Sequence, residues 1–194
     1  MKRISLVLSA TLAVGSTLIG QELIVDQEYA PGGITASVSP FVGLGQEFTP
    51  RLDSMDFVNV SLFNLNPGGP STFQVSIHEG SITGPTVGTS PVTLGSTDLW
   101  TEFTFASTLS LTPNNIYVIQ VEQLSGDSGW GLLHNFPANG TYDFGTAIVG
   151  GTPQSFDFRF QEGVIAVPEP SLLLLTFVST IVAGLIIKIR NPPA

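Results

Sequence analysis

The sequence predicts an all-β fold, a single antiparallel β-sandwich or jelly roll that lies between an N-terminal signal-peptide helix and a C-terminal transmembrane helix. Three observations lead to this prediction. Several short runs in the middle of the chain alternate apolar and polar residues, which is the pattern of half-buried strands. The 21 glycines and 14 prolines recur between these runs, where they favour turns. Uncharged, largely apolar stretches stand near both ends of the 194-residue chain.

Residues 1–20 have the layout of a secretory signal peptide. Met1 is followed by Lys2 and Arg3, and then by uncharged residues from Ile4 to Ile19. A basic start followed by an apolar stretch is what the export machinery recognises. We therefore expect export of Sec type, with cleavage by signal peptidase between about Ser16 and Gly20.

Residues 21–166 are predicted to form the extracytoplasmic domain, which is large enough to fold around one core. Alternation is clearest in 56–65, 72–80, 99–105, 115–124 and 155–163, and it is weaker in 22–26, 34–38, 129–135 and 142–150. In the segment 155–163, Phe156, Phe158 and Phe160 would face the core. Asp157, Arg159 and Gln161 would face away from it.

The predicted domain is acidic and the chain has no cysteine. The net charge of the chain is −9, and the middle keeps only Arg51 and Arg159 as basic residues. Nucleic-acid binding is therefore excluded, because it depends on basic residues that neutralise phosphates. The absence of cysteine excludes thiol chemistry and zinc–thiolate sites. No cofactor is expected, and calcium is left open at loop aspartates, namely Asp26, Asp53, Asp56 and Asp127.

No catalytic residue is predicted, although one short stretch invites comparison. Gly126 to Trp130 is similar to the Gly-Asp-Ser-Gly-Gly sequence of trypsin-like proteases, and His78, Asp98 and Ser128 follow the order of that family's triad. Trp130 replaces the last glycine, and the span from His78 to Ser128 is too short for the scaffold of such a triad. A turn between two strands is the favoured interpretation of the stretch from Gly126 to Trp130. Acid pairs leave a surface polysaccharide hydrolase as an alternative, the pairs being Asp53 with Asp56 and Glu79 with Asp98.

Aromatic side chains raise the leading alternative, a carbohydrate-binding module, which ranks ahead of the hydrolase. Aromatic side chains can stack on sugar rings, although most aromatic residues at alternating positions belong to the core. Trp130 stands between two glycines in a predicted loop and is the candidate glycan-binding residue, although packing in the core or within the loop is the favoured interpretation of this ring as well. Other rings that could take part are Trp100, Tyr117, Tyr142 and Tyr29.

The last 28 residues, 167–194, form a tail with a membrane segment. Sixteen uncharged residues, 172–187, would span about 24 Å as a helix, against about 30 Å for the hydrocarbon core of a bilayer. Ile189 and the long side chains of Lys188 and Arg190 extend the reach, so the predicted helix covers about 172–189. The basic pair should lie in the cytoplasm.

This tail resembles the PEP-CTERM protein-sorting signal of Gram-negative bacteria, which is also called the ice-binding protein C-terminal domain. The matching residues of the sorting motif are Val167, Pro168, Glu169, Pro170 and Ser171, and the apolar helix and the basic Lys188 and Arg190 follow them. The resemblance implies that exosortase recognises and cleaves the membrane-anchored precursor. It also implies delivery to the cell surface or to an exopolysaccharide matrix, as in biofilms.

The middle is similar to secreted β domains that precede such tails, in the stretches "GQEFTPRLDSMDFVNVSL", "SIHEGSITGPTVGTS" and "LTPNNIYVIQVEQLSGDSGWG". That likeness supports the fold and implies no activity. The expected protein is therefore an exported, non-enzymatic β-sandwich with a structural or adhesive role in an exopolysaccharide matrix.

Overall fold

The computed structural model describes residues 21–31, 34–38, 43–64, 71–94, 100–126, 129–135 and 141–166. Residues 23–166 form one compact unit by themselves. The predicted signal peptide, 1–20, and the predicted sorting tail, 167–194, lie outside the described residues. Among the residues that are described, none belongs to a helix with the length and apolar character needed to cross a membrane.

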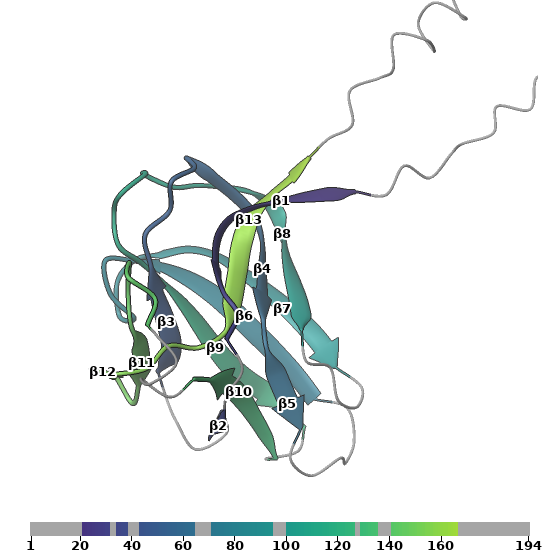
Figure 1. Ribbon diagram of the computed structural model, residues 1–194. Helices are drawn as coiled ribbons and strands as arrows, with labels where there is room; N and C mark the ends of the chain where they lie inside the picture. The colour runs from purple at the N-terminus through teal and green to yellow at the C-terminus, as the bar shows by residue number, and fades with distance from the viewer. Residues whose placement is uncertain are drawn as a thin grey trace, which may run out of the picture. The chain divides into compact units, whose positions relative to one another are not determined.

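The regular elements of the described part are strands that form three antiparallel sheets (Figure 1). The four-stranded sheet has the order β1 (Glu22–Tyr29), β13 (Phe160–Ala166), β4 (Ser54–Val60) and β8 (Thr101–Ser110). The three-stranded sheet has the order β2 (Ile34–Ser37), β10 (Trp130–His134) and β5 (Leu62–Asn64). The six-stranded sheet has the order β12 (Thr152–Pro153), β11 (Ala147–Val149), β3 (Leu44–Phe48), β9 (Tyr117–Ser125), β6 (Ser71–Glu79) and β7 (Thr86–Leu94).

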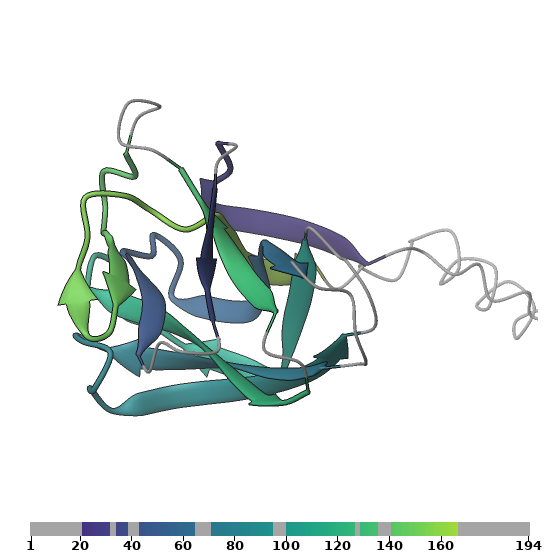
Figure 2. The ribbon, with the colours of Figure 1, turned by 90° about the horizontal axis from the view of Figure 1, so that it is seen from below.

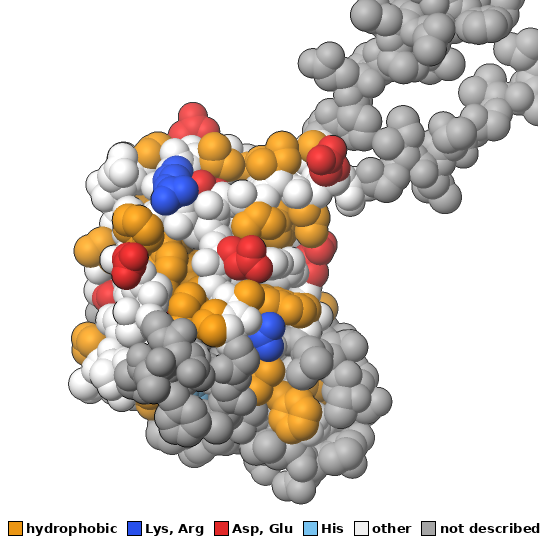
Figure 3. Space-filling view, in the orientation of Figure 1, with side chains coloured by type: hydrophobic (Ala, Val, Ile, Leu, Met, Phe, Trp, Pro, Cys, Tyr) orange, Lys and Arg blue, Asp and Glu red, His pale blue; other side chains and the backbone are white. Residues whose placement is uncertain are grey.

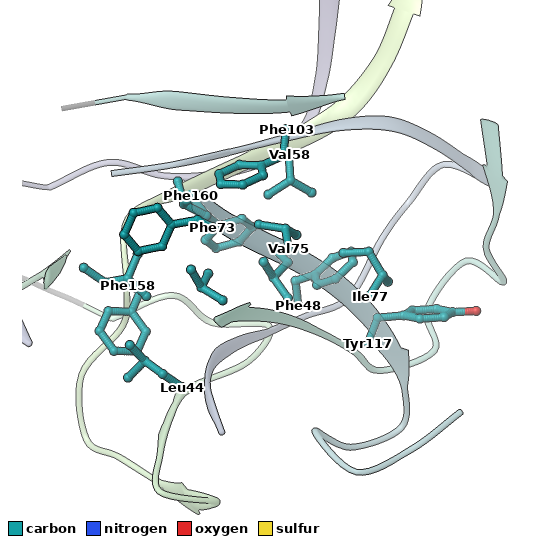
Figure 4. Packing of buried hydrophobic residues seen from close by; sticks show 14 of the residues in the cluster. Leu44, Phe48, Val58, Phe73, Val75, Ile77, Phe103, Tyr117, Phe158 and Phe160 are labelled. Atoms are coloured by element: carbon teal, nitrogen blue, oxygen red, sulfur yellow. The ribbon is translucent and has the colours of Figure 1, made fainter. Parts of the chain in front are cut away.

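The sheets pack together like a sandwich, which confirms the predicted all-β antiparallel fold. Figure 2 shows the long strands of the six-stranded sheet as one layer, with the other sheets opposite them. The core lies between the layers and draws on both (Figure 4). Val58, Phe103 and Phe160 come from the four-stranded sheet, and they face residues such as Phe73 and Ile77 of β6.

Alternation predicts the buried face of the clearest strands correctly. Phe73, Val75 and Ile77 of β6 are fully buried. In β8 the inward Phe103 and Phe105 alternate with the exposed Glu102 and Thr104. This is the period of two that a strand with one face in the core must show.

One predicted strand, 56–65, is in fact two. β4 ends at Val60, and β5 begins at Leu62 in a different sheet. Ser61 lies between them; its N–H donates to the Arg159 carbonyl (3.3 Å) and its carbonyl accepts from the Leu133 N–H (2.9 Å). The alternation of apolar and polar residues continues from β4 through Ser61 into β5, because both strands bury apolar side chains. The sequence pattern alone therefore does not reveal the change of sheet.

The predicted strand 155–163 is also shorter in the structure. β13 begins only at Phe160, and Phe158 makes an isolated bridge to His134. Asp157, which we expected to face away from the core, is buried at 2% exposure. Its side chain is held by hydrogen bonds that the alternation rule does not consider.

Besides the two-residue β12, two longer strands were not predicted, β3 and β7. β3 has the sequence LGQEF, in which Gln46 is buried through side-chain hydrogen bonds. β7 contains Pro91 and lies at the edge of its sheet, where a missing N–H is tolerated. Both strands owe their place to neighbouring strands rather than to a clear pattern of their own.

Candidate functional site

The structure places Trp130 in strand β10 and buries its ring completely. The ring packs edge-on against Phe73 of the opposite layer, with 5.2 Å between ring centroids. Pairing of β10 with β2 and β5 turns the ring into the core, so Trp130 offers no exposed ring face on which a sugar could stack. Three of the other proposed rings are buried as well, those of Tyr29, Tyr117 and Tyr142.

Trp100 is the ring from that set that reaches the surface, with 36% of its residue area exposed. The Arg159 guanidinium lies over it, 4.9 Å from the ring centroid. The two residues directly precede Thr101 and Phe160, which both pair with Val60 of the central strand β4. Trp100 and Arg159 thus meet across the end of β4, on the face that points away from the core.

A row of polar side chains adjoins this contact. Asn59 of β4 pairs with Glu102 on one side and with Gln161 on the other. The Asn59 amide donates to Gln161 Oε1 (3.3 Å), and the Gln161 amide donates to Glu28 Oε1 (2.8 Å). We name this set the outer strip, and it consists of Glu28, Asn59, Trp100, Glu102, Arg159 and Gln161.

The outer strip combines an aromatic ring with amide, carboxylate and guanidinium groups on one face of a sheet. Such groups can contact the apolar face and the hydroxyls of a sugar, and they suit a flat, hydroxyl-rich ligand. Figure 3 shows how apolar, acidic and basic side chains alternate on the surface in the orientation of Figure 1. Sequence reasoning missed the strip because its members come from four strands.

The residues that follow the protease order and the two acid pairs lie only partly within the described residues. His78 lies in β6, and its Nδ1 is 3.0 Å from the Gly84 carbonyl oxygen, whereas Asp98 and Ser128 lie outside the described residues. Asp56 accepts hydrogen bonds from the Thr108 hydroxyl (2.6 Å) and the Ile165 N–H (2.9 Å). Its carboxylate therefore joins β4 to β8 and β13.

Of the aspartates considered for calcium, Asp26 and Asp56 lie on strands β1 and β4 rather than in loops, and the described ones accept hydrogen bonds within the fold. Asp26 accepts from the N–H groups of Arg51 and Leu52, and Asp53 accepts from the Ser54 hydroxyl. Asp127 lies outside the described residues. Across the described ranges there is no group of three acidic, histidine or cysteine side chains that could hold a metal ion.

A buried polar cluster around Asp157 explains the burial of that residue. Its carboxylate accepts from the Gln46 amide (3.0 Å) and from the Tyr142 N–H (2.9 Å). Gln46 in turn accepts from the Phe158 N–H (2.8 Å), and Asn135 accepts from the Asp157 N–H (3.3 Å). Burial raises the pKa of Asp157 above its ordinary value, and the bonds from Tyr142 and Gln46 act in the opposite direction.

The cluster extends to the first strand. The Asn135 amide donates to the Tyr29 hydroxyl, and the Tyr142 hydroxyl donates to Gln27 Oε1 (3.0 Å). Burial raises the pKa of Tyr142 well above its ordinary value, so this hydroxyl stays protonated and remains a donor. The cluster ties β1, β3 and the segment before β13 together, which is a structural role.

The residues of the proposed sorting motif, 167–171, and the basic residues at 188 and 190 lie outside the described residues. Comparison with models of known protein families gives no match to this chain, and a search of curated proteins finds no similar sequence. The outer strip is the candidate site that the described residues offer.

Proposed function

We propose that this chain is an exported, non-enzymatic β-sandwich that is sorted to the cell surface through its tail and serves as a structural or adhesive component of an exopolysaccharide matrix. In this proposal, signal peptidase removes residues 1–20 and exosortase acts at the motif 167–171. The helix 172–189 holds the precursor in the inner membrane of a Gram-negative-type bacterium until then.

The observation that supports this proposal best is the position of the two ends of the domain. β1, the first strand, and β13, the last, are neighbours in one sheet. Gln161 bonds to Glu28, and Gly163 lies against Ile24, so the start of β1 and the end of β13 lie side by side (Figure 1). A domain that is attached at one place keeps the rest of its surface free for contacts with a matrix.

Mass spectrometry of the protein isolated from its bacterium tests the sorting proposal. We expect a new N-terminus between about Ser16 and Gly20 and loss of the residues that follow the motif. Glu169→Ala should leave the precursor intact in the membrane fraction, because the motif is no longer recognised. Asn191→Ala, outside the motif, is the matched control and should be processed normally. Surface-located wild-type protein that still ends at Ala194 contradicts processing.

A second function, binding of a neutral polysaccharide, is favoured by the outer strip. Affinity electrophoresis of the full chain, in a detergent without a sugar headgroup, can measure retention by the polymer of the host's own matrix. Trp100→Ala should abolish the retention. Phe144→Ala is a close control, since Phe144 is also exposed and also lies under an arginine, Arg51, at 5.6 Å. Equal retention of both variants and the wild type would count against a role for the strip.

A further inference from the structure

Glu162 is a carboxyl group in the apolar core. It lies on β13 two residues after Phe160, and the two side chains share the inward face. Their partners on β4 are Val58 and Val60, which belong to the core as well. Glu162 is fully buried, and neither of its carboxyl oxygens accepts a hydrogen bond. An ionised carboxylate in such a place is costly, so the group has to be neutralised.

The group that approaches Glu162 is a second carboxyl, that of Asp26 on the neighbouring strand β1. The Asp26 carboxylate accepts from the N–H groups of Arg51 (2.7 Å) and Leu52 (2.9 Å), both through Oδ2. These two N–H donors hold the Asp26 carboxyl in place beside Glu162. Glu162 has no such donors, so a proton shared by the two groups belongs on Glu162.

The other groups around Glu162 do not supply a charge or a donor. Val58 on β4 is apolar. Tyr142, from the segment before β11, interacts electrostatically with both acids, but its hydroxyl donates to Gln27. The Arg51 side chain lies over the Phe144 ring. Within the described residues, a proton is thus the simplest means of neutralising Glu162, since a cation would need more oxygen ligands than two carboxyls offer.

We propose that Asp26 and Glu162 share one proton and form a pH-sensitive latch between the first and the last strand of the domain. In the closed latch the Glu162 O–H donates to the Asp26 carboxylate, and one negative charge remains. When the O–H bond breaks, the proton passes to water and two carboxylates face each other between β1 and β13, that of Glu162 being fully buried. Their repulsion loosens β1 from β13. The latch does not depend on the function proposed above.

The direction of the pH effect follows from the shift in the pKa of Glu162. Burial, and then the charge of Asp26, raise this pKa to about 9 in the folded chain, from an ordinary value near 4.5. Below the ordinary value both folded and unfolded chains hold the proton. At a pH between the ordinary pKa and the raised pKa of Glu162, only the folded chain holds this proton. The folding equilibrium constant therefore falls about tenfold for each unit of pH in this range. Above a pH of about 9 the folding equilibrium constant stops falling, because both folded and unfolded chains have lost the proton.

Urea unfolding of the full chain in detergent micelles, followed by tryptophan fluorescence, tests the latch between pH 5 and pH 9. Other buried acids contribute to the profile, so the quantity to measure is the ratio of the wild-type folding constant to that of Glu162→Gln. The glutamine keeps the shape and stays neutral. We expect the ratio to fall by about tenfold per pH unit. A ratio that does not change with pH overturns the proposal.

Two further variants keep the test decisive. Glu79→Gln removes an exposed carboxylate at the end of β6 and should retain the wild-type profile. Asp26→Asn keeps an oxygen for the Arg51 and Leu52 N–H groups but removes the charge that faces Glu162, so the decline should end at a lower pH. If Glu162→Gln does not fold, an unshifted profile of Asp26→Asn overturns the latch. Stabilisation by millimolar calcium that is absent in Asp26→Asn would do so too, because a cation would then occupy the pair.

Discussion

At the residue scale, the described domain depends on aromatic rings whose position cannot be judged from their neighbours in sequence. Trp130 stands beside glycines in sequence yet is fully buried, whereas Trp100, between Leu99 and Thr101, is partly exposed. The difference arises from strand pairing, which turns one ring inward and leaves the other beside Arg159 on the outer face. Composition near a ring is a poor guide to its exposure.

The Trp130→Ala variant should therefore be less stable to unfolding than the wild-type domain. Removing a fully buried indole leaves a cavity next to Phe73 and should cost about 3–5 kcal/mol of folding free energy. Trp100→Ala is the matched control and should cost much less, because its ring is partly in water already. Urea unfolding followed by circular dichroism measures both values. Equal losses for the two variants would mean that Trp130 is not a core residue.

At the element scale, the contact between β1 and β13 is close. A Cβ atom placed on Gly163 would lie 2.0 Å from the backbone oxygen of Ile24, and backbone cannot move aside as a flexible side chain does. The absence of a side chain at residue 163 is thus a condition for β1 to lie where it does. The same contact positions Asp26 and Glu162.

Gly163→Ala should displace β1 selectively. We expect a loss of about 1–3 kcal/mol, as for other overpacked sites. Hydrogen exchange on the full chain should show lost protection for the amides of β1, while those of β6, which lies between β9 and β7 in the six-stranded sheet, keep theirs. An equal loss of hydrogen-exchange protection in β1 and β6 would mean that the clash at residue 163 is relieved by movement outside β1.

The sequence predicts some of these elements well and others poorly. β6, β8 and β9 are evident because one face of each is apolar and the other polar. β3 is not evident, because Gln46 is buried by bonds to residues more than one hundred positions away. The outer strip could not be predicted, since its register depends on which strands are neighbours. Alternation within one strand carries no information on that order.

At the scale of the whole molecule, charge is the dominant feature. The chain carries a net charge of −9. The two arginines of the described domain, Arg51 and Arg159, both lie over aromatic rings. Acidic side chains therefore repel one another over the surface with little compensation. Such repulsion favours solubility but lowers the stability of the compact state.

Salt should accordingly stabilise the domain. The screening length falls from about 30 Å at 0.01 M ionic strength to about 10 Å at 0.1 M. We expect the Tm of the full chain at neutral pH to rise by a few degrees over this range of sodium chloride. An uncharged osmolyte at equal osmolality is the control and should have a smaller effect. A Tm that falls with salt would show that attractive ion pairs outweigh the repulsion.

Ser61 has a consequence for how the molecule comes apart. Its N–H is bonded to the residue before β13 and its carbonyl to β10, so one peptide segment belongs to two sheets at once. Neither sheet can separate without breaking the bonds of the other at this point. Loss of one of these two sheets should therefore bring loss of the other, so the four-stranded and three-stranded sheets, which lie opposite the six-stranded sheet, should open as one cooperative unit.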